Sequence, residues 1–396
     1  MKVLSLFSGI GAFEKALNVL KIPYELVGYC EIDKYASKSY SAIHDVPETM
    51  NLGDITKIDE KALPKDIDLI TYGFPCQDIS LAGKQKGLFN EDGSQTRSGL
   101  FFEALRIIEE TQPRVAIAEN VKNLTGKKFN AQFQIVLASL EAAGYNNYWQ
   151  VLNAKDYGIP QNRERVFIVS IRKDIDTGSF KFPEPFPLEL RLKDMLEDEV
   201  DEKFYLSEKM LNFFIKNSKV QQEKGNGFKF EPTNGDVIAK TITTRAGGRM
   251  DDNFIEVFDL YNGTQIDPNV VGTITTGCSR NGSGTFLVRE ATKKGYAEAV
   301  EGDSINLEQP NSKTRRGRVG HGVAQTLTTS PQQAVVQRVL IRKLTPKECF
   351  RLMGFSDEDF AKAETVNSNT QLYKQAGNSI VVDVIAHIFT QLKKEM

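Results

Sequence analysis

A cysteine in a shaped turn is the first candidate for chemistry in this sequence. Cys76 follows Pro75 and comes just after an apolar run at 67–72, which predicts a buried strand. A thiol past a strand end lies on the rim where such sheets bind reactants, and the turn can aim amide N–H groups at a thiolate. Because a free thiol is mostly protonated at neutral pH, this placement suits a nucleophile. The alternative is a buried, inert cysteine, although the flanking Gly73 and Pro75 favour a shaped turn.

A carboxylate and two arginines are expected near the same rim. Glu119 ends the predicted strand at 115–119. Arg163 and Arg165 lie two residues apart just before the predicted strand at 166–171, so an extended backbone projects both from one side. Such an arginine pair can form a structural ion pair with a carboxylate, or it can stabilise negative charge on a substrate.

A further group of residues predicts an adenosyl-binding site. Ser8, Gly9 and Gly11 form a glycine-rich turn between a predicted strand and a predicted helix, where the backbone can approach a nucleotide closely. Glu31 ends the next strand and can accept both ribose hydroxyls, and Asp54 is placed to accept a hydrogen bond from an adenine amine. Each acid alone is typical of an exposed carboxylate. Together, at successive strand ends, they favour an adenosine ligand.

One demanding reaction needs a thiol, a carboxylic acid, arginines and an adenosyl site. Carbon 5 of cytosine becomes an enamine carbon when a thiolate adds to carbon 6 and an acid engages ring nitrogen 3, and it can then attack a methyl sulfonium. Arginine stabilises charge at the base carbonyl oxygen. A target inside a duplex must be flipped out, and the long polar loop at 84–98 is placed to close over it.

The framework for these residues is predicted by the first 172 residues. Short apolar runs predict strands at 2–6, 25–31, 67–72, 115–119, 149–152 and 166–171. Apolar spacing near 3.6 predicts helices between them, at 12–20, 35–43, 100–110 and 133–143. This alternation predicts an α/β fold with a mostly parallel, doubly wound sheet, whose ligands lie at the carboxyl ends of the strands.

The composition changes after a proline-rich stretch at 180–187, where Gly, Thr and Asn become frequent. We therefore expect a smaller, irregular, β-rich domain at 196–369. Residues 378–392 have helical apolar spacing and are expected to rejoin the first domain, which is then discontinuous at 1–195 and 370–396.

Three copies of one threonine-rich phrase lie in the middle region, at 239–244, 271–276 and 324–329. Their unequal spacing excludes a solenoid. They are either three ordinary strands, which threonine suits, or three strands that jointly present loops to one ligand.

Bulk properties suit a soluble globular protein of two or three domains, with 396 residues, 40% hydrophobic and 26% charged. The net charge of −2 gives no hint of nucleic acid, but basic residues outnumber acidic ones between 207 and 343. This excess is either a set of solvated loops or a phosphate-binding surface.

Cysteine and histidine spacing predicts neither a metal site nor disulfides, and unpaired thiols suit a cytoplasmic protein. The short apolar start is interrupted by Glu14 and Lys15 and lacks a cleavage pattern, so secretion is not expected. No apolar stretch is long enough to predict a membrane span.

Taken together, the motifs resemble those of the DNA cytosine-5 methyltransferases, in particular the bacterial and phage enzymes. The resemblance covers nearly the whole chain and keeps the family's order of blocks. The similar segments are 6–11, 73–77, 119–121, 161–165, 342–355, which resembles the block that supports the recognition domain, and 375–379. Two departures are Ser5, where aspartate is common, and Ala12, where a second glycine is common; both affect the first cofactor block.

The resemblance implies S-adenosylmethionine as cofactor, double-stranded DNA as partner, and a role for each matching residue. The implied catalytic residues are Cys76, Glu119, Arg163 and Arg165. The implied cofactor contacts are Phe7, Ser8, Gly9, Gly11, Glu31, Ile32, Asp54, Ile55, Pro75, Leu100, Asn378 and Ser379. The expected DNA contacts are Gln77, Lys84, Gln85, Gln161, Arg245, Arg249, Arg280, Arg315 and Arg316. We further expect a monomer, acting in a bacterial or phage-infected cell as a restriction–modification or self-protection methylase.

Three other functions remain open on the sequence alone. An RNA cytosine methyltransferase would share the chemistry, although such relatives usually lack so large a variable region. A catalytically inactive DNA-binding protein could use the same fold, although Cys76, Glu119 and Arg165 are all intact. An unrelated nucleotide-binding oxidoreductase would fit the sheet pattern but not the remaining motifs.

Overall fold

The computed structural model describes residues 1–76, 79, 87–90, 92, 94–225, 227–258, 278–280, 286–299, 303–306, 317–322, 333–335 and 339–392. The chain divides into two compact units. The first unit comprises Met1–Val200, Gly235–Asn253 and Leu344–Met396, and the second comprises Asp201–Asn234 and Phe254–Lys343.

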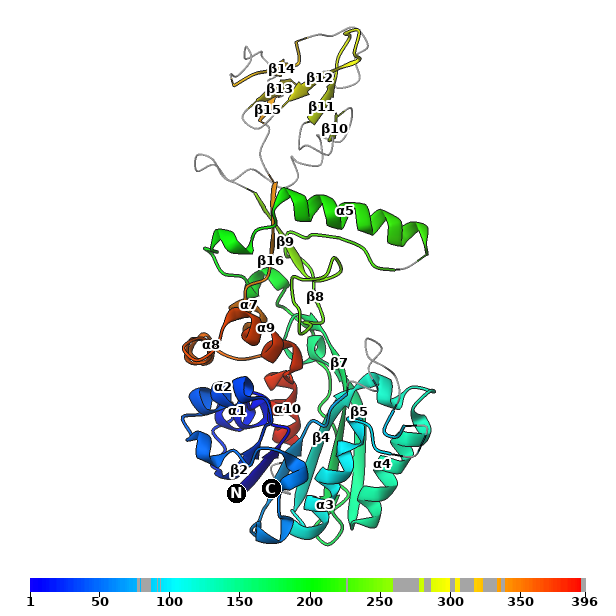
Figure 1. The fold of residues 1–396 in the computed structure, drawn as a ribbon, viewed down its shortest axis with the longest axis vertical. Helices are drawn as coiled ribbons and strands as arrows, with labels where there is room; N and C mark the ends of the chain where they lie inside the picture. The colour runs from blue at the N-terminus through cyan, green and yellow to red at the C-terminus, as the bar shows by residue number, and fades with distance from the viewer. Residues whose placement is uncertain are drawn as a thin grey trace. The chain divides into compact units, whose positions relative to one another are not determined.

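A six-stranded sheet with the order β2-β1-β3-β4-β7-β5 forms the centre of the first unit (Figure 1). Its strands are β1 Lys2–Leu6, β2 Glu25–Cys30, β3 Leu69–Tyr72, β4 Val115–Val121, β5 Tyr145–Asn153 and β7 Glu164–Arg172. All neighbouring strands from β2 to β4 are parallel, whereas β7 is antiparallel to both β4 and β5. The reversal follows from the short connection between β5 and β7, because a parallel pair needs a longer crossover. The predicted mostly parallel α/β fold is confirmed.

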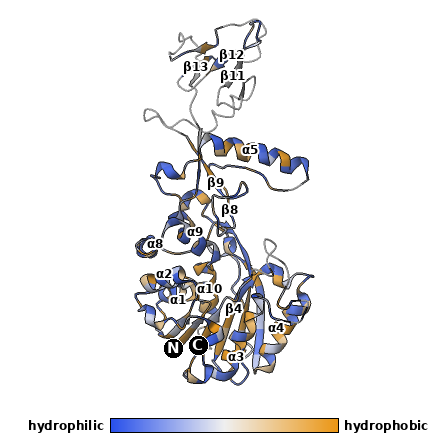
Figure 2. Ribbon diagram, viewed as in Figure 1, coloured by the Kyte–Doolittle hydropathy of each residue, from blue (hydrophilic) through white to orange (hydrophobic). Residues whose placement is uncertain are grey.

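Both faces of this sheet are covered. Side chains alternate between faces along a strand, and in β3 both Ile70 and its neighbours Leu69 and Thr71 are fully buried. One face packs against α3 Phe101–Thr111 and α4 Asn130–Ala142 through a continuous hydrophobic core. Hydrophobic colour accordingly concentrates on the strands and on the helix faces turned toward them (Figure 2).

The carboxyl-terminal helices complete the first unit. They are α7 Pro346–Arg351, α8 Asp357–Glu364, α9 Asn369–Asn378 and α10 Val382–Leu392. Helix α10 packs on α1 Ala12–Val19, and α8 and α9 pack on α2 Lys34–His44. Of the segment 378–392, for which the sequence predicts a helix, α10 forms the part from Val382 to Leu392, and Asn378 is the last residue of α9.

The division of the chain differs from the expected boundaries in two places. Residues 344–369 belong to the first unit because Glu348, which is fully buried, accepts hydrogen bonds from the backbone N–H groups of Thr345 and Glu197. Residues 235–253 belong there because Gly235 and Val237 accept backbone hydrogen bonds from Lys193 and Leu192.

The first threonine-rich phrase lies within this inserted segment. Its strand β8 Ala239–Lys240 pairs in parallel with β6 Gln161–Asn162. Thr241 donates a hydrogen bond to the carbonyl of Asn162 at 2.6 Å. The other two copies lie outside the described residues.

The second unit is smaller and irregular. It contains α5 Glu208–Glu223 and an antiparallel pair formed by β9 Phe254–Phe258 and β16 Val339–Lys343. The rings of Phe214, Phe230 and Phe254 pack together beneath this helix. Two three-stranded sheets consist of β10 Cys278–Arg280, β11 Phe286–Arg289 and β12 Tyr296–Ala299, and of β14 Val319–Gly320, β13 Ser304–Asn306 and β15 Gln333–Val335.

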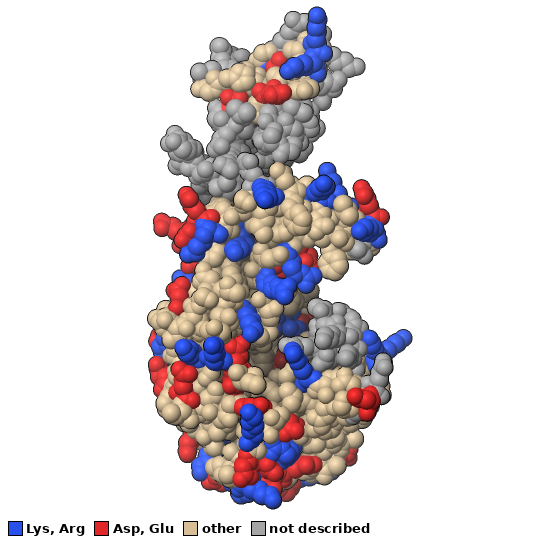
Figure 3. All heavy atoms as spheres, in the orientation of Figure 1, with Lys and Arg blue, Asp and Glu red and all other residues tan. Residues whose placement is uncertain are grey.

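Charged side chains of both signs are interspersed over the visible face of the first unit (Figure 3). Within the described residues, no three His, Cys, Asp or Glu side chains gather as a metal site would require. Nor does any described helix combine the length and apolarity that crossing a membrane takes.

Candidate active site

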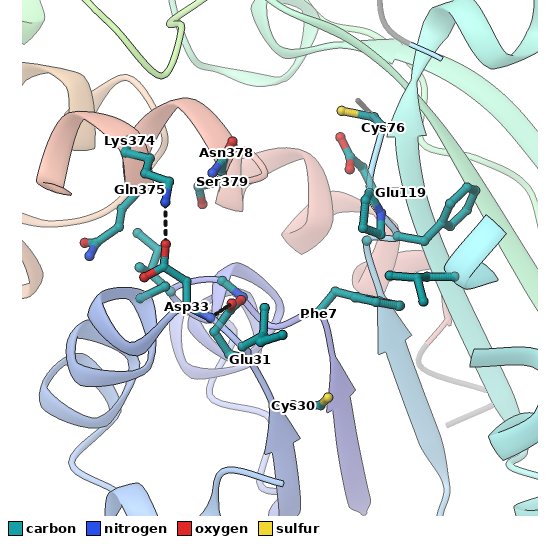
Figure 4. A pocket seen from close by; sticks show the side chains of 18 of the residues that line it. Phe7, Cys30, Glu31, Asp33, Cys76, Glu119, Lys374, Gln375, Asn378 and Ser379 are labelled. Atoms are coloured by element: carbon teal, nitrogen blue, oxygen red, sulfur yellow. Dashed lines mark hydrogen bonds and ion pairs between the residues drawn. The ribbon is translucent and has the colours of Figure 1, made fainter. Parts of the chain in front are cut away.

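A cavity of about 410 Å³ opens at the carboxyl ends of β1 to β4 (Figure 4). Its walls come from the turns after these strands, from β7 and from residues 374–379, all within the first unit. This is the edge at which an open α/β sheet binds its ligands. Cys76 and Glu119 lie at one end of the cavity, and Glu31 and Asp33 lie toward the other (Figure 4).

At the first end, an ion pair lies beside the thiol. The Nε of Arg165 lies 2.9 Å from Oε1 of Glu119. The pair follows from the register of β4 and β7, in which Arg165 stands opposite Val121 and is therefore a diagonal neighbour of Glu119 on the same face. The sequence prediction that Cys76, Glu119 and Arg165 come together matches this arrangement, since all three line the cavity.

Burial governs protonation at this end. It raises the pKa of Cys76, and the neighbouring Glu119 raises it further, whereas the Arg165 and Arg163 guanidiniums lower it. Burial also raises the pKa of Glu119, against the opposing effect of the same two arginines. The carboxyl group therefore keeps a proton to higher pH than an exposed glutamate, as an acid that must engage a ring nitrogen requires.

The guanidinium of Arg163 donates its hydrogen bonds to backbone carbonyls. It is almost fully buried and donates to the carbonyls of Ile242 at 3.1 Å, Gly377 at 3.1 Å and Ser379 at 2.7 Å. Its Nε is buried with no hydrogen-bond partner in the described structure. These hydrogen bonds hold Arg163 between Ile242 and the segment 377–379, and the catalytic role predicted for it stays a prediction.

At the other end, Glu31 organises the backbone of the glycine-rich turn. One carboxylate oxygen accepts the N–H of Gly9 at 2.9 Å and the other accepts the N–H of Asp33 at 2.7 Å. Phe7, which precedes this turn, has a φ of 52°, a left-handed conformation that few non-glycine residues adopt. Such strained backbone is common at ligand sites.

Apolar side chains also line the cavity. Ile32 is 76% exposed although it is a large hydrophobic residue, and it lines the cavity with Ile55 and Leu100. Asp54 also lines the wall, and its Oδ1 accepts the backbone N–H of Thr56 at 3.1 Å. Apolar walls beside two hydrogen-bond acceptors suit a planar base joined to a ribose, so the residues present fit an adenosyl group.

Most of the predicted cofactor residues line the cavity. These are Phe7, Gly9, Glu31, Ile32, Asp54, Ile55, Pro75, Leu100, Asn378 and Ser379. Ser8 and Gly11 do not line the cavity but belong to the turn whose other residues do. Ser8 Oγ donates to the carbonyl of Cys30, and a Cβ on Gly11 would come within 2.1 Å of His44 Nε2.

The expected DNA contact of Gln161 is not supported by the structure. Its side chain is fully buried, donating to the carbonyl of Leu352 at 2.7 Å and accepting the N–H of Ile242 at 3.0 Å. The side-chain amide of Gln161 points into the first unit, where its hydrogen bonds connect β6 to Ile242 and to Leu352. Gln161 is therefore a structural residue.

The other predicted DNA contacts are placed only in part. Arg245 and Arg249 are exposed, and Arg249 forms an ion pair with Asp251 at 3.1 Å. Arg280 lies in β10, but its side chain is outside the described structure, as are Gln77, Lys84, Gln85, Arg315 and Arg316.

Three residues to which the sequence analysis assigned no role also lie in or beside the site. Asn120 is buried beside Glu119, and Asp33 and Lys374 form an ion pair on the cavity wall. Asn120 follows an acid at a strand end, which is a local signal. The pairing of Asp33 with Lys374 has no local signal, because the two residues are 341 positions apart.

The doubly wound sheet, its cofactor-sized cavity, and the thiol beside a carboxyl–guanidinium pair define a group-transfer enzyme with a nucleotide-type cofactor. Comparisons with known proteins define the reaction. A family model described as C-5 cytosine-specific DNA methylase matches residues 1–394.

Individual relatives agree with the family match. The orphan methyltransferase M.SPRI of Bacillus phage SPR is 36% identical over 99% of this chain and 97% of its own length. The type II methyltransferase M2.ScrFI of Lactococcus lactis subsp. cremoris is 34% identical over 100% and 99%. The methyltransferase EhMeth of Entamoeba histolytica has the same fold, with a TM-score of 0.62, 15% identity and coverage of 100% and 98%.

The chain belongs to the C-5 cytosine-specific DNA methylase family. Its activity is that of a DNA (cytosine-5-)-methyltransferase, and its methyl donor is S-adenosylmethionine. The resemblance found in the sequence is thereby confirmed.

Proposed function

We propose that Cys76 is the nucleophile of this methyltransferase and that the base binds between Cys76, Glu119 and Arg165. The observation that carries the proposal is the Arg165–Glu119 ion pair of 2.9 Å, which lies beside the thiol in the cavity that also holds the cofactor residues. No other described thiol lies beside both an acid and an arginine in this cavity: Cys30 is buried on its adenosyl side, and Cys349 is fully buried in α7.

Each group has a defined task in the reaction. The thiolate of Cys76 adds to carbon 6 of cytosine while Glu119 engages ring nitrogen 3, so that electron density develops at carbon 5. Arg165 fixes the orientation of Glu119 and stabilises charge at the base carbonyl oxygen. The bound cofactor supplies an electrophilic methyl group on its sulfonium. Once the methyl group has moved from sulfur to carbon 5, with S-adenosylhomocysteine as the leaving group, a solvent base takes the proton from carbon 5, and elimination of the Cys76 thiolate from carbon 6 restores the aromatic ring.

The site lies on the rim of a sheet, and a base stacked in a helix cannot reach it. We therefore infer that the substrate is duplex DNA from which one cytosine is flipped out. The enzyme is expected to act as a monomer, because each role in the reaction is assigned to residues of one chain. It is further expected to act in the cytoplasm of a bacterial or phage-infected cell. The relatives, an orphan phage methyltransferase and a type II methyltransferase, support a role in phage self-protection or restriction–modification.

A mechanism-based trap tests the nucleophile directly. Duplex DNA that carries 5-fluorocytosine blocks the loss of the carbon 5 substituent, so the attacking thiol stays bonded to the base. We expect a covalent adduct mapped to Cys76 by peptide mass spectrometry, and none with Cys76→Ser. Absence of an adduct in the wild-type protein, or its location at another residue, would contradict the proposal. Transfer of labelled methyl groups to transfer RNA but not to duplex DNA would instead identify an RNA enzyme.

A further inference from the structure

An ion pair closes one side of the cofactor end of the cavity. Nζ of Lys374 in α9 lies 2.6 Å from Oδ2 of Asp33, the residue that caps the start of α2 (Figure 4). Both residues line the cavity. The pair therefore joins the returning carboxyl-terminal segment to the strand end that carries Glu31.

Asp33 is in turn bonded to the residue proposed to hold the ribose. Its backbone N–H donates to one oxygen of Glu31 at 2.7 Å, and its Oδ1 accepts the N–H of Tyr35 at 2.9 Å. The other oxygen of Glu31 accepts the N–H of Gly9. A continuous set of contacts thus runs from Lys374 through Asp33 and Glu31 to the glycine-rich turn.

Helix α9 carries this set of contacts toward the reactive end of the cavity. Gln375, next to Lys374, donates to the carbonyl of Tyr35 at 3.0 Å and accepts the hydroxyl of Ser39 at 2.8 Å. At the end of the same helix, the carbonyls of Gly377 and Ser379 accept hydrogen bonds from Arg163. One helix therefore spans the distance between Glu31 and the arginines beside Cys76.

We propose that Lys374 is a positioning residue for the cofactor, acting through Asp33 on Glu31. The inference rests on the proposed cofactor site. The Lys374 side chain is 48% exposed, and an ion pair this accessible contributes little to folding. The Lys374–Asp33 ion pair instead affects the geometry of the cofactor end of the cavity. It holds Asp33 where its backbone N–H donates to Glu31, and it holds α9 against α2 beside the cavity.

The chain offers a matched control. Lys362 in α8 forms an ion pair of 2.7 Å with Asp45, the residue that follows the other end of α2. This pair also joins a carboxyl-terminal helix to α2, and neither of its residues lines the cavity. Removing it tests the general effect of losing such a contact.

The experiment compares Lys374→Met with Lys362→Met in the full-length protein. We expect the dissociation constant of S-adenosylhomocysteine, measured by titration calorimetry, to rise about three- to fivefold in Lys374→Met, as for the loss of one accessible ion pair. The KM for S-adenosylmethionine should rise in parallel while kcat stays within about twofold, since the reacting groups are untouched. Lys374→Arg should restore both values, and Lys362→Met should leave them unchanged.

The possible outcomes separate this inference from the proposed function. A Lys374→Met change below about threefold, or an equal change in Lys362→Met, overturns the positioning role. If Lys374→Met does not fold, Asp33→Asn removes the same pair from the other side while keeping a side-chain oxygen to cap α2. Glu31→Ala tests the site itself: if it leaves the dissociation constant unchanged, the proposed cofactor site fails, whatever Lys374 does.

Discussion

The amide of Asn120 donates a hydrogen bond of 3.0 Å to the carbonyl of Phe74. This contact joins the end of β4 to the turn that carries Cys76, so the acid and the thiol are held relative to each other through Asn120, next to Glu119, and Phe74, two residues before Cys76. The other atom of the amide, Oδ1, accepts the N–H of Val121 at 2.8 Å. Asn120 is 2% exposed, and both of its hydrogen bonds are made within the protein.

Asn120→Ala should therefore lower kcat more than it lowers cofactor affinity. The substitution leaves the carbonyl of Phe74 without this donor and lets the Pro-Cys turn shift, which we expect to cost about 10- to 100-fold in kcat by misplacing the thiol. Loss of the buried contacts should also destabilise the fold by about 1–3 kcal/mol. Single-turnover methylation and calorimetric S-adenosylhomocysteine binding measure the two effects. Asn146→Ala, which removes an exposed contact with Asp176, is the control.

Replacement of the acid tests the carboxyl group separately from its size. Glu119→Gln keeps the shape of the side chain but removes the titrating proton and the ion pair with Arg165, so kcat should fall about 10²- to 10⁴-fold. Cofactor binding should change little, because Glu31, the residue proposed to hold the ribose, lies toward the other end of the cavity (Figure 4). A Glu119→Gln enzyme with wild-type kcat would exclude this residue from the chemistry.

The fold class and much of the site could be predicted from the sequence because both depend on local patterns. Parallel strands bring their carboxyl ends to one edge, so acids and a cysteine placed after successive apolar runs must meet there. Glu31, Cys76 and Glu119 all follow this rule. The direction of β7 could not be predicted in this way, because an apolar run has the same pattern in either orientation.

Contacts between distant segments could not be predicted from such patterns. Gln161 belongs to a polar stretch that looks exposed, yet its side chain is buried and bonds to the backbone of Ile242 and Leu352. The pairing of Lys374 with Asp33 depends on how α9 packs against α2. The spacing of residues within either helix does not predict that packing. The same holds for Arg163, whose three backbone partners come from two segments far along the chain.

The correction for Gln161 leads to a prediction about DNA binding. Gln161→Ala should lower the free energy of unfolding by about 1–3 kcal/mol, because two buried partners lose their hydrogen bonds. The salt dependence of DNA binding should be unchanged, since no phosphate contact is lost. Arg245→Ala, at an exposed arginine, should instead reduce the slope of log affinity against log salt by about one if Arg245 contacts a phosphate. An altered salt slope in Gln161→Ala with unchanged stability would show that its side chain does reach DNA.

A buried acid in α1 should make stability depend on pH. Glu14 is fully buried, its carboxylate oxygens have no hydrogen-bond partner among the described residues, and burial raises its pKa to about 7. The hydroxyls of Ser5 and Tyr40 lie close enough to lower this pKa in part, although neither forms a hydrogen bond with the carboxylate. Because the folded state binds the proton more tightly than the unfolded state, stability falls as pH rises from about 4.5 to 7, by about 3 kcal/mol.

Comparison with Glu14→Gln isolates this contribution. Burial lowers the pKa of the nearby His44 to about 4, so His44 makes stability rise with pH over part of the same range. That contribution is common to both proteins. The difference in free energy of unfolding between variant and wild type should therefore increase in favour of Glu14→Gln from pH 4.5 to 7 and level off above it. A difference independent of pH would show that Glu14 is not protonated in the folded state.

Methylation in a host that has no cytosine methylation of its own tests the central claim most directly. The wild-type protein and Cys76→Ser are expressed to equal soluble levels, and the host DNA is sequenced after bisulfite conversion. Wild-type cells should show cytosines protected from conversion in a defined sequence context, which also reveals the target site, and Cys76→Ser cells should show none. Conversion of all cytosines despite soluble wild-type protein, or protection by Cys76→Ser, would contradict the assignment of Cys76 as the nucleophile of a DNA cytosine-5 methyltransferase.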